Sequence, residues 1–411
     1  MISHTTAKNI IKTHLTPLEN YESVNIENAI SRVNYKDITA KENILNFKRC
    51  AMDGFAIRIK DLNIAASVGL KIVDTIDAGQ VSKIKIQKGE CIGVATGAPL
   101  PDGADMVVMV EDTKIENYDQ KNFATQNFNS QYSLYCDEKF KKIILTKINQ
   151  TKSNYDEIGS DIKKGVTVVF ANEVLDTARI AMLAGIGIRQ IEVFRKLKVG
   201  IIATGNELVA PGKSTNYGEI YDSNSYMIYS MLSQFCEVKR YGIIPDDYDK
   251  IKEVIEKSDD DVLITIGGTS MGEKDLVFKI VENEGNMLFH NISIKPGKPT
   301  FFGEFDKKFI FGLPGNPASC FVMMHVLIIP EIRMASNLPV KIKKINLKID
   351  REITAEKRDL FMPVKLKNNT AIPTYKHSGA ISSILNAKGY IRVKAGESVK
   401  KGDVVCVNLF V

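Results

Sequence analysis

The sequence predicts an α/β multidomain protein, in which a central domain with a mostly parallel sheet lies between regions of short β-strands. Two observations support this prediction. From residue 197 onward, strands without polar interruption alternate with helical segments, which is typical of a parallel sheet covered on both faces. Before and after that stretch, short strands of alternating polarity are separated by turn residues. With 411 residues, the chain has room for about two to four domains.

The first 40 residues are predicted to form a helix and then a strand. The segment 16–33 has helical spacing, and Pro17 can occupy the first turn of that helix. Between residues 65 and 112, turn signals such as Asp-Ala-Gly-Gln separate short β-type segments, which predicts a small all-β module. Residues 176–188 are predicted to form a helix that is closed by one of its glycines.

The central domain alternates strands and helices. Residues 197–205 and 261–268 are predicted to be buried strands, because they are almost wholly apolar. Ser223 is the expected N-cap of the first helix in this region. Helices are expected at 223–235, 247–258 and 273–285 and from about Asn316, and a final β domain at 340–411 is expected to hold strands near 344–350, 362–367, 389–395 and 403–409.

Composition argues against several classes of function. The net charge is +6, and the lysines are scattered rather than gathered with aromatic residues, so we expect no nucleic-acid partner. No apolar run approaches the roughly 20 residues that span a bilayer, so we expect no membrane association. The first 15 residues lack the apolar core of a secretory signal, which indicates a cytoplasmic protein.

The six cysteines indicate neither a zinc site nor a disulfide framework. None belongs to a CxxC motif, and the five histidines are dispersed. We expect buried thiols in a reducing compartment. The cysteines are Cys50, Cys91, Cys136, Cys236, Cys320 and Cys406.

Ligands of an open parallel sheet bind beyond the carboxyl ends of its strands. Four loops are expected at such ends, and each has Gly or Pro beside polar side chains. Their agreement is a stronger signal than any one loop. The loops are 203–208, 267–275, 295–299 and 313–319.

The loop 267–275 follows a buried strand and opens a helix. Gly267 and Gly268 permit close backbone approach to a ligand, and the free amides at the helix start favour an anion such as phosphate. The loop matches neither the Walker pattern nor GxGxxG. A tight turn without a ligand is an equally good interpretation of this loop alone.

Two carboxylates near this edge are candidate Mg²⁺ ligands. Asp275 closes the loop, and Asp222 stands at the start of another helix, the one predicted at 223–235. Mg²⁺ takes few protein oxygens and keeps several waters, so a pair of carboxylates near a bound phosphate is sufficient. Each aspartate alone is more typical of a helix cap, especially Asp222, since Ser223 and Asn224 can share that role.

Two proline-glycine turns complete the predicted site. Lys295 and Lys298 flank Pro296-Gly297, and a lysine serves phosphate as a point charge. Solvated surface lysines are the alternative. In the turn 313–319, Pro317 suits a first helical turn, Ser319 is expected to cap, and Asn316 is open to either capping or ligand contact.

Taken together, these segments resemble the molybdopterin molybdenumtransferases, the MoeA family, whose domains recur in gephyrin. The resemblance spans nearly the whole chain, and so many motifs in one order are highly specific. Besides the loops above, it rests on residues 49–58, 95–113, 159–165, 201–212 and 218–225.

The resemblance implies four parts and a dimer. A discontinuous helical and β linker domain (1–44 and 140–176) encloses an inserted small β domain (45–139). A doubly wound α/β domain of the molybdopterin-binding type (177–335) and a C-terminal small β-barrel-like domain (336–411) follow. In an elongated homodimer, each active site is expected between the α/β domain of one subunit and the inserted domain of the other.

The resemblance also implies the reaction. Molybdenum from molybdate is inserted into adenylylated molybdopterin with Mg²⁺, and AMP is released. Molybdopterin adenylyltransferase and apo-molybdoenzymes or their chaperones are candidate partners. The family pattern implies catalytic roles for Asp53, Thr96, Asp222, Asp275 and Lys295, metal binding by Asp222 and Asp275, substrate contacts from Gly267, Gly268, Ser270, Lys298, Asn316, Arg358 and Ser378, and shaping roles for Pro314 and Pro317.

Departures from the family pattern leave two rival functions open. Arg179 stands where some members have a functional glutamate, and Asn291 aligns with a family lysine. These changes favour a non-catalytic scaffold of the gephyrin sort, whereas the retained site residues argue against it. A stand-alone adenylyltransferase of the same α/β fold would not explain residues 49–58 and 95–113. Molybdate and tungstate are both tetrahedral dianions, so the sequence does not choose between them.

Overall fold

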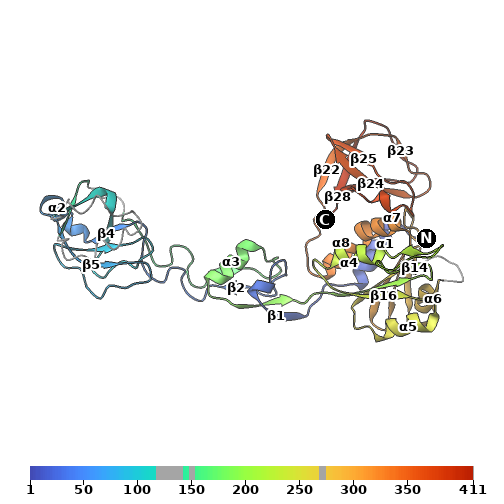
Figure 1. The fold of residues 1–411 in the computed structure, drawn as a ribbon, viewed down its shortest axis with the longest axis horizontal. Coiled ribbons are helices and arrows are strands. Elements are labelled where there is room, and N and C mark those ends of the chain that lie inside the picture. Colours follow the sequence, from blue (N-terminus) through green and yellow to red (C-terminus); the bar gives the residue numbers. More distant parts are fainter. Residues whose placement is uncertain (117–141, 148–152, 268–274, 411) are drawn as a thin grey trace. The chain divides into compact units, whose positions relative to one another are not determined.

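The computed structural model describes residues 1–116, 142–147, 153–267 and 275–410 (Figure 1). The described chain forms two compact units. The larger unit contains Met1–Lys36, Ala171–Thr177 and Gln190–Val411, and the smaller unit contains Asp37–Phe170 and Ala178–Arg189. This division does not test the four predicted domain boundaries, which stay a prediction.

A six-stranded sheet forms the centre of the larger unit, in the order β16-β13-β17-β21-β20-β18. The first four strands of this order are parallel, β20 is antiparallel to β21, and β18 is antiparallel to β20. The mostly parallel sheet is therefore confirmed. The bounds are β13 (Lys198–Thr204), β16 (Glu237–Ile244), β17 (Val262–Ile266), β18 (Asn286–His290), β20 (Phe301–Phe305) and β21 (Lys308–Leu313).

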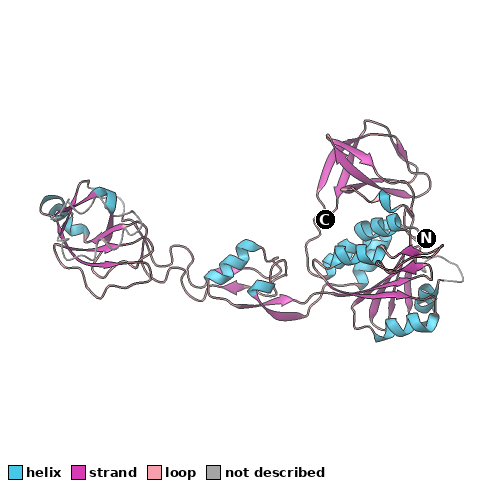
Figure 2. Ribbon diagram, viewed as in Figure 1, coloured by secondary structure: helices cyan, strands magenta, loops and turns pink. Residues whose placement is uncertain are grey.

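Helices cover both faces of this sheet, as Figure 2 shows. One apolar core joins the sheet to α1, α4, α7 and α8, and a second joins it to α5 and α6. This is the doubly wound arrangement that the sequence predicts. The bounds are α1 (His4–His14), α4 (Asn224–Leu232), α5 (Tyr248–Lys257), α6 (Leu276–Glu284), α7 (Pro317–Met323) and α8 (Ile329–Ala335).

A π-helical segment, η6 (Met324–Ile328), joins α7 to α8 in one continuous helix, Pro317–Ala335. By length and composition this helix is apolar enough to cross a membrane, which the sequence analysis did not recognise. However, 78% of its most apolar window is buried inside the structure. Its apolar character is explained by its position in the core of the larger unit.

The C-terminal sheet closes on itself in the order β19-β24-β25-β22-β28-β26, with a further pairing of β24 and β26. This closure confirms the predicted barrel-like domain, to which β19 is contributed by the central part of the chain. The strands are β19 (Ile294–Lys295), β22 (Lys344–Ile349), β24 (Asp359–Lys367), β25 (Thr370–Pro373), β26 (Gly389–Val393) and β28 (Val404–Leu409), beside the small pair β23 (Ile353–Thr354) and β27 (Ser398–Val399) and the turn η7 (Ile381–Ser383).

The helix predicted at 16–33 is wrong. The helix lies earlier, in α1, where the Ser3 hydroxyl accepts a hydrogen bond from the Thr6 amide at 3.0 Å and caps the first turn. The region predicted as helix instead contains β1 (Tyr21–Asn25), which pairs antiparallel with β12 (Gln190–Phe194), and the 3₁₀ turn η1 (Ile26–Asn28). Pairing with a distant strand overrides the local helical spacing.

The smaller unit contains a six-stranded sheet in the order β7-β4-β6-β5-β9-β8. The strands confirm the predicted β module, but a short helix, α2, was not predicted. The strands of this sheet are β4 (Gly54–Ile57), β5 (Leu70–Ile76), β6 (Glu90–Val94), β7 (Met106–Met109), β8 (Thr113–Glu116) and β9 (Lys142–Leu145). Two further strand pairs are β2 (Ile38–Thr39) with β11 (Thr167–Val169) and β3 (Arg49–Cys50) with β10 (Tyr155–Asp156). The helical elements are η2 (Ile59–Asp61), α2 (Leu62–Ser67), η3 (Val110–Asp112) and α3 (Thr177–Gly185), whose first residue belongs to the larger unit.

Five cysteines are free thiols, and four of them are buried as predicted. Burial raises the pKa of Cys50 to about 11 and that of Cys236 to about 12, so both are neutral. Cys406 is exposed, contrary to the prediction. It alternates with inward-facing Val405 and Val407 on β28 and therefore lies on the outer face of the strand. Cys136 lies outside the described residues.

Candidate active site

The carboxyl ends of the parallel strands β13, β17 and β21 meet at one edge of the central sheet. The Gly267 amide donates to the Leu313 carbonyl at 3.0 Å. Gly267 has φ +90°, and a Cβ there would lie 2.7 Å from the Thr204 carbonyl oxygen. Only glycine fits this backbone position and this close approach. Three of the four predicted loops are therefore neighbours at their strand ends.

The turn with two lysines lies at the same edge, because it precedes β20, whose Phe301 pairs with Gly312 near the end of β21. Pro296 and Gly297 are buried, whereas Lys295 and Lys298 are exposed. Gly297 has φ +110°, and a Cβ there would collide with the Met323 side chain of α7. The fold thus fixes the turn and leaves its two cations at the surface.

Both predicted aspartates are 5% exposed. Asp222 accepts a hydrogen bond from the Ser225 amide at 3.0 Å and another from the Ser225 hydroxyl. It therefore caps α4 through its side chain, as the alternative interpretation held, whereas Ser223 stands at the cap position without a capping bond. The predicted N-cap position of Ser223 is therefore confirmed, whereas the capping hydrogen bond comes from Asp222, which already satisfies that amide.

Asp275 stands at the N-cap position of α6 but makes no capping hydrogen bond to the described part of that helix. Capping is therefore not what its side chain does there. Asn224, two residues after Asp222, donates to the Gly315 carbonyl at 2.6 Å and ties the start of α4 to the proline-glycine turn after β21. Sequence reasoning gave Asn224 only a capping role.

The turn after β21 begins α7, with Asn316 at the N-cap and Pro317 in the first turn. Asn316 is exposed and makes no capping bond through its side chain, which leaves its amide for other contacts. Ser319 was predicted to cap, but it lies inside the helix and is buried. The Pro317 ring explains the shift, because proline is preferred just inside a helix start.

The C-terminal domain adds two of the predicted residues to this edge. Strand β19 pairs with β24, and Arg358 donates from its guanidinium to the Ile294 carbonyl at 3.1 Å. The Ser378 carbonyl accepts from the Ala318 amide at 3.0 Å, and a Cβ at Gly379 would lie 3.3 Å from the Asn316 amide oxygen. Arg358 and Ser378 therefore flank the two proline-glycine turns.

Asp53 and Thr96 meet within the smaller unit. One carboxylate oxygen of Asp53 accepts from the Thr96 amide at 2.6 Å and from its hydroxyl at 2.7 Å. Asp53 immediately precedes β4, where a Cβ on Gly54 would collide with the Val108 carbonyl. Asp53 thus connects two loops and is more than part of an Asp-Gly turn.

Four residues that the sequence analysis singled out are not part of the contacts described above. Gly268 and Ser270 lie outside the described residues. Asn291 has a left-handed backbone, with φ +67°, which asparagine tolerates better than most residues, and this gives a structural reason for its presence. Arg179 lies in α3 of the smaller unit.

The donor set of this edge suits Mg²⁺. The described residues contain no cluster of three or more His, Cys, Asp or Glu side chains that would hold a metal alone. Mg²⁺ is usually bound by one or two carboxylates together with waters and substrate phosphates. The Ser225 amide and hydroxyl that donate to Asp222 are neutral, so these two hydrogen bonds do not cancel the carboxylate charge.

Comparisons with known proteins agree along the chain. Residues 2–187 match the MoeA N-terminal region (domain I and II), residues 200–334 a probable molybdopterin binding domain, and residues 346–410 the MoeA C-terminal region (domain IV).

Two relatives are named molybdopterin molybdenumtransferase. The protein from Haemophilus influenzae is 33% identical over 314 residues, which cover 76% of this chain and 72% of the relative. The protein from Staphylococcus epidermidis is 30% identical and covers 98% of this chain and 94% of its own length.

A solved structure is similar over the full length. The molybdopterin biosynthesis MoeA protein from Pyrococcus horikoshii has a TM-score of 0.82 and 31% identity, and the match covers 100% of this chain and 99% of the other. The order of the matched regions, the identity to the relatives and this fold lead to one conclusion. The chain belongs to the MoeA family.

Proposed function

We propose that this protein is a molybdopterin molybdenumtransferase, which uses molybdate to insert molybdenum into adenylylated molybdopterin and releases AMP during molybdenum cofactor biosynthesis. The observation that supports this proposal is the meeting of Gly267, the lysine turn and the turn after β21 at one sheet edge, flanked by Arg358. The substrates are a pyrophosphate-linked nucleotide and an oxyanion. Both need cations and hydrogen-bond donors.

Each group has a role that its position suits. Lys295 and Lys298 are exposed on a buried turn and would neutralise phosphate or molybdate oxygens. Asn316, in the turn after β21, offers a side-chain amide that makes no capping bond. Asp222 and Asp275 would hold Mg²⁺, which when bound neutralises phosphate charge and polarises the phosphoryl group.

Asp53 and Thr96 would act from the inserted domain of a second subunit. Their mutual hydrogen bonds hold the carboxylate in a defined place before any substrate arrives. A homodimer with a shared site is therefore part of the proposal. Mixing a Thr96→Val chain with a Lys295→Gln chain tests it, because some mixed dimers would contain one intact site and recover turnover. Absence of recovery in verified mixed dimers would contradict a shared site.

The direct test measures AMP release from adenylylated molybdopterin after molybdate is added. Lys295→Gln should reduce AMP release strongly, because one of the two cations of the turn is lost. Lys307→Gln is the matched control, since Lys307 is exposed at the opposite end of β20. A scaffold would release no AMP, and a stand-alone adenylyltransferase would form adenylylated pterin instead. Either result would overturn the proposal.

A further inference from the structure

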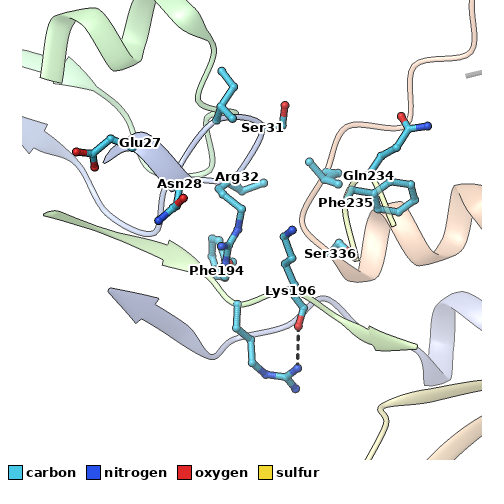
Figure 3. Close-up of a pocket in the computed structure, with 13 residues that line it drawn as sticks. Glu27, Asn28, Ser31, Arg32, Phe194, Lys196, Gln234, Phe235 and Ser336 are labelled. Carbon is cyan, nitrogen blue, oxygen red and sulfur yellow. Dashed lines mark hydrogen bonds between the residues drawn. The ribbon is translucent and has the colours of Figure 1, made fainter. Parts of the chain in front are cut away.

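A second pocket lies at the amino edge of the central sheet, and Figure 3 shows its lining residues. Its volume is about 340 Å³, which is in the range of small-molecule sites. Lys196 and Phe235 line it and precede β13 and β16, so the pocket lies where these parallel strands begin. The seven residues of β13, at roughly 3.3 Å per residue, separate it from the carboxyl edge by about 20 Å.

Most cations around this pocket are matched to carboxylates. Arg32 pairs with Glu22 at 2.5 Å, and Arg195 makes two hydrogen bonds of 2.7 Å to Asp261. These guanidinium groups are held in place by the fold. They stabilise the walls and contribute little free charge to a ligand.

Lys196 is the exception. It is partly buried, and within the described parts of the chain it makes no ion pair or side-chain hydrogen bond. In Figure 3 its side chain points into the space bounded by Ser31, Phe235 and Ser336, while the Glu27 carboxylate lies on the far side of the pocket. An ammonium group that makes no ion pair, in a pocket whose lining carboxylate lies on the far side, favours an anionic occupant.

Phe235 and Leu338 form an apolar part of the pocket lining. Leu338 is 9% exposed, and the Arg333 guanidinium lies over the Phe235 ring at 5.3 Å from its centroid. Arg333 is in turn held by two hydrogen bonds to the Pro339 carbonyl. The ring is therefore pre-positioned to pack against a flat apolar group.

We propose that this pocket binds a small organic anion, with its carboxylate or phosphate at the Lys196 ammonium and an apolar ring against Phe235 and Leu338. Neither the molybdenum nor the pterin substrate is expected there, because the pocket lies at the opposite edge from the site of the proposed reaction. The occupant also contacts the segment after β1 and the turn before β16, and it would stabilise their packing.

Calorimetric titration of the full chain with benzoate and with phenyl phosphate tests the proposal, and the two probes distinguish a carboxylate from a phosphate ligand. Benzylamine has a similar ring and the opposite charge, so it should not bind. Lys196→Met keeps the aliphatic stem, removes the charge and should weaken binding by at least about tenfold. Lys198→Met is the matched control, because Lys198 is held by Asp259 and should leave binding unchanged.

Lys295→Gln separates this pocket from the carboxyl edge and should retain the binding that Lys196→Met loses. Turnover of the Lys196→Met protein should equal that of the unmodified protein. If neither probe binds, if Lys196→Met binds as tightly as the unmodified chain, or if Lys295→Gln abolishes all binding, the proposal is overturned. None of these results bears on AMP release, so the proposed reaction is tested separately.

Discussion

The two edges of the central sheet treat positive charge differently. At the amino edge, two cations are matched, Arg195 by Asp261 at 2.7 Å and Lys198 by Asp259 at 2.6 Å, whereas Lys196 makes no ion pair with the described residues. At the carboxyl edge, neither lysine of the buried turn makes an ion pair with the described residues. A cation matched to a carboxylate supports the fold, whereas an unmatched cation on a fixed turn remains available to a ligand. Charge matching, more than charge count, thus distinguishes the cations that support the fold from those that we propose to bind ligands.

Replacing Asp222 by Asn gives the largest expected effect and tests whether the carboxyl edge needs this charge. Asparagine caps a helix about as well as aspartate, so the melting temperature should change little. AMP release should fall by about 100-fold if the carboxylate holds a charge-stabilising metal ion. Asp259→Asn, at the amino edge, is the control and should keep full turnover. Normal turnover of Asp222→Asn would remove the functional role of this carboxylate.

Acid pH tests whether the ion pairs of the amino edge control stability, because a buried histidine, His325, changes its protonation state in a pH range in which those pairs keep their charge. Burial lowers the pKa of His325 to about 4, from 6.5 in the unfolded chain. Between these values the unfolded chain binds more protons, so stability falls as pH decreases from about 6.5 to 4, by about 3 kcal/mol in total. The Lys198 hydrogen bond lowers the pKa of Asp259, so that pair keeps its charge in this window.

His325→Phe should therefore flatten the pH dependence of unfolding by urea. The ring stacks on Phe410 with centroids 4.1 Å apart, so an aromatic replacement keeps most of this contact. An unchanged slope between pH 6.5 and 4 in the variant would show that other groups control acid stability.

Substituting Gly297 tests whether the carboxyl-edge turn is fixed by packing. Gly297→Ala meets both a positive φ and the Met323 side chain, so unfolding free energy should fall by about 2–3 kcal/mol and turnover should decrease. Gly396→Ala is the matched control, because Gly396 has φ +81° but open space around a Cβ, and it should cost only about 1 kcal/mol. Equal losses of unfolding free energy in both variants would mean that the Met323 side chain moves aside without an energetic penalty.

Removing Asp261 gives the smallest effect. Asp261→Ala leaves Arg195 and the Lys198 amide without their shared acceptor, and both partners of the ion pair are 27% exposed. We expect a loss of about 1–2 kcal/mol in unfolding free energy with unchanged AMP release. A large drop in turnover at full stability would break the distinction between the two edges.

The sequence predicted the central sheet because strands such as 262–266 are apolar on both faces, and no tertiary knowledge is needed to recognise them. The loops at their carboxyl ends followed from the topology of parallel sheets. The helix at 4–14 was missed, because its helical spacing is no clearer than that of 16–33, where pairing of β1 with β12 decides the structure. Local pattern cannot rank two such segments.

The roles of some site residues could be predicted from the local sequence, whereas those of others depend on long-range strand pairing. The capping role of Asp222 was a local alternative and could be stated in advance. The placement of Arg358 at the Ile294 carbonyl depends on the pairing of β19 with β24, about 60 residues apart along the chain, which no local pattern encodes. Lys196 was not singled out from the sequence. A lysine without a carboxylate partner is recognised only when the three-dimensional positions of the surrounding carboxylates are known.

The short strand β19 belongs to the C-terminal barrel, yet the turn that follows it leads directly into the central sheet. A movement of the barrel would also move Lys295, because Lys295 pairs with Leu360 of β24 within the barrel sheet. A truncation after Leu338 would thus disturb far more than a tail. It would remove the strand that pairs with β19 on one side of the lysine turn. The two ammonium groups would then lose their fixed positions, and we expect phosphate binding to weaken.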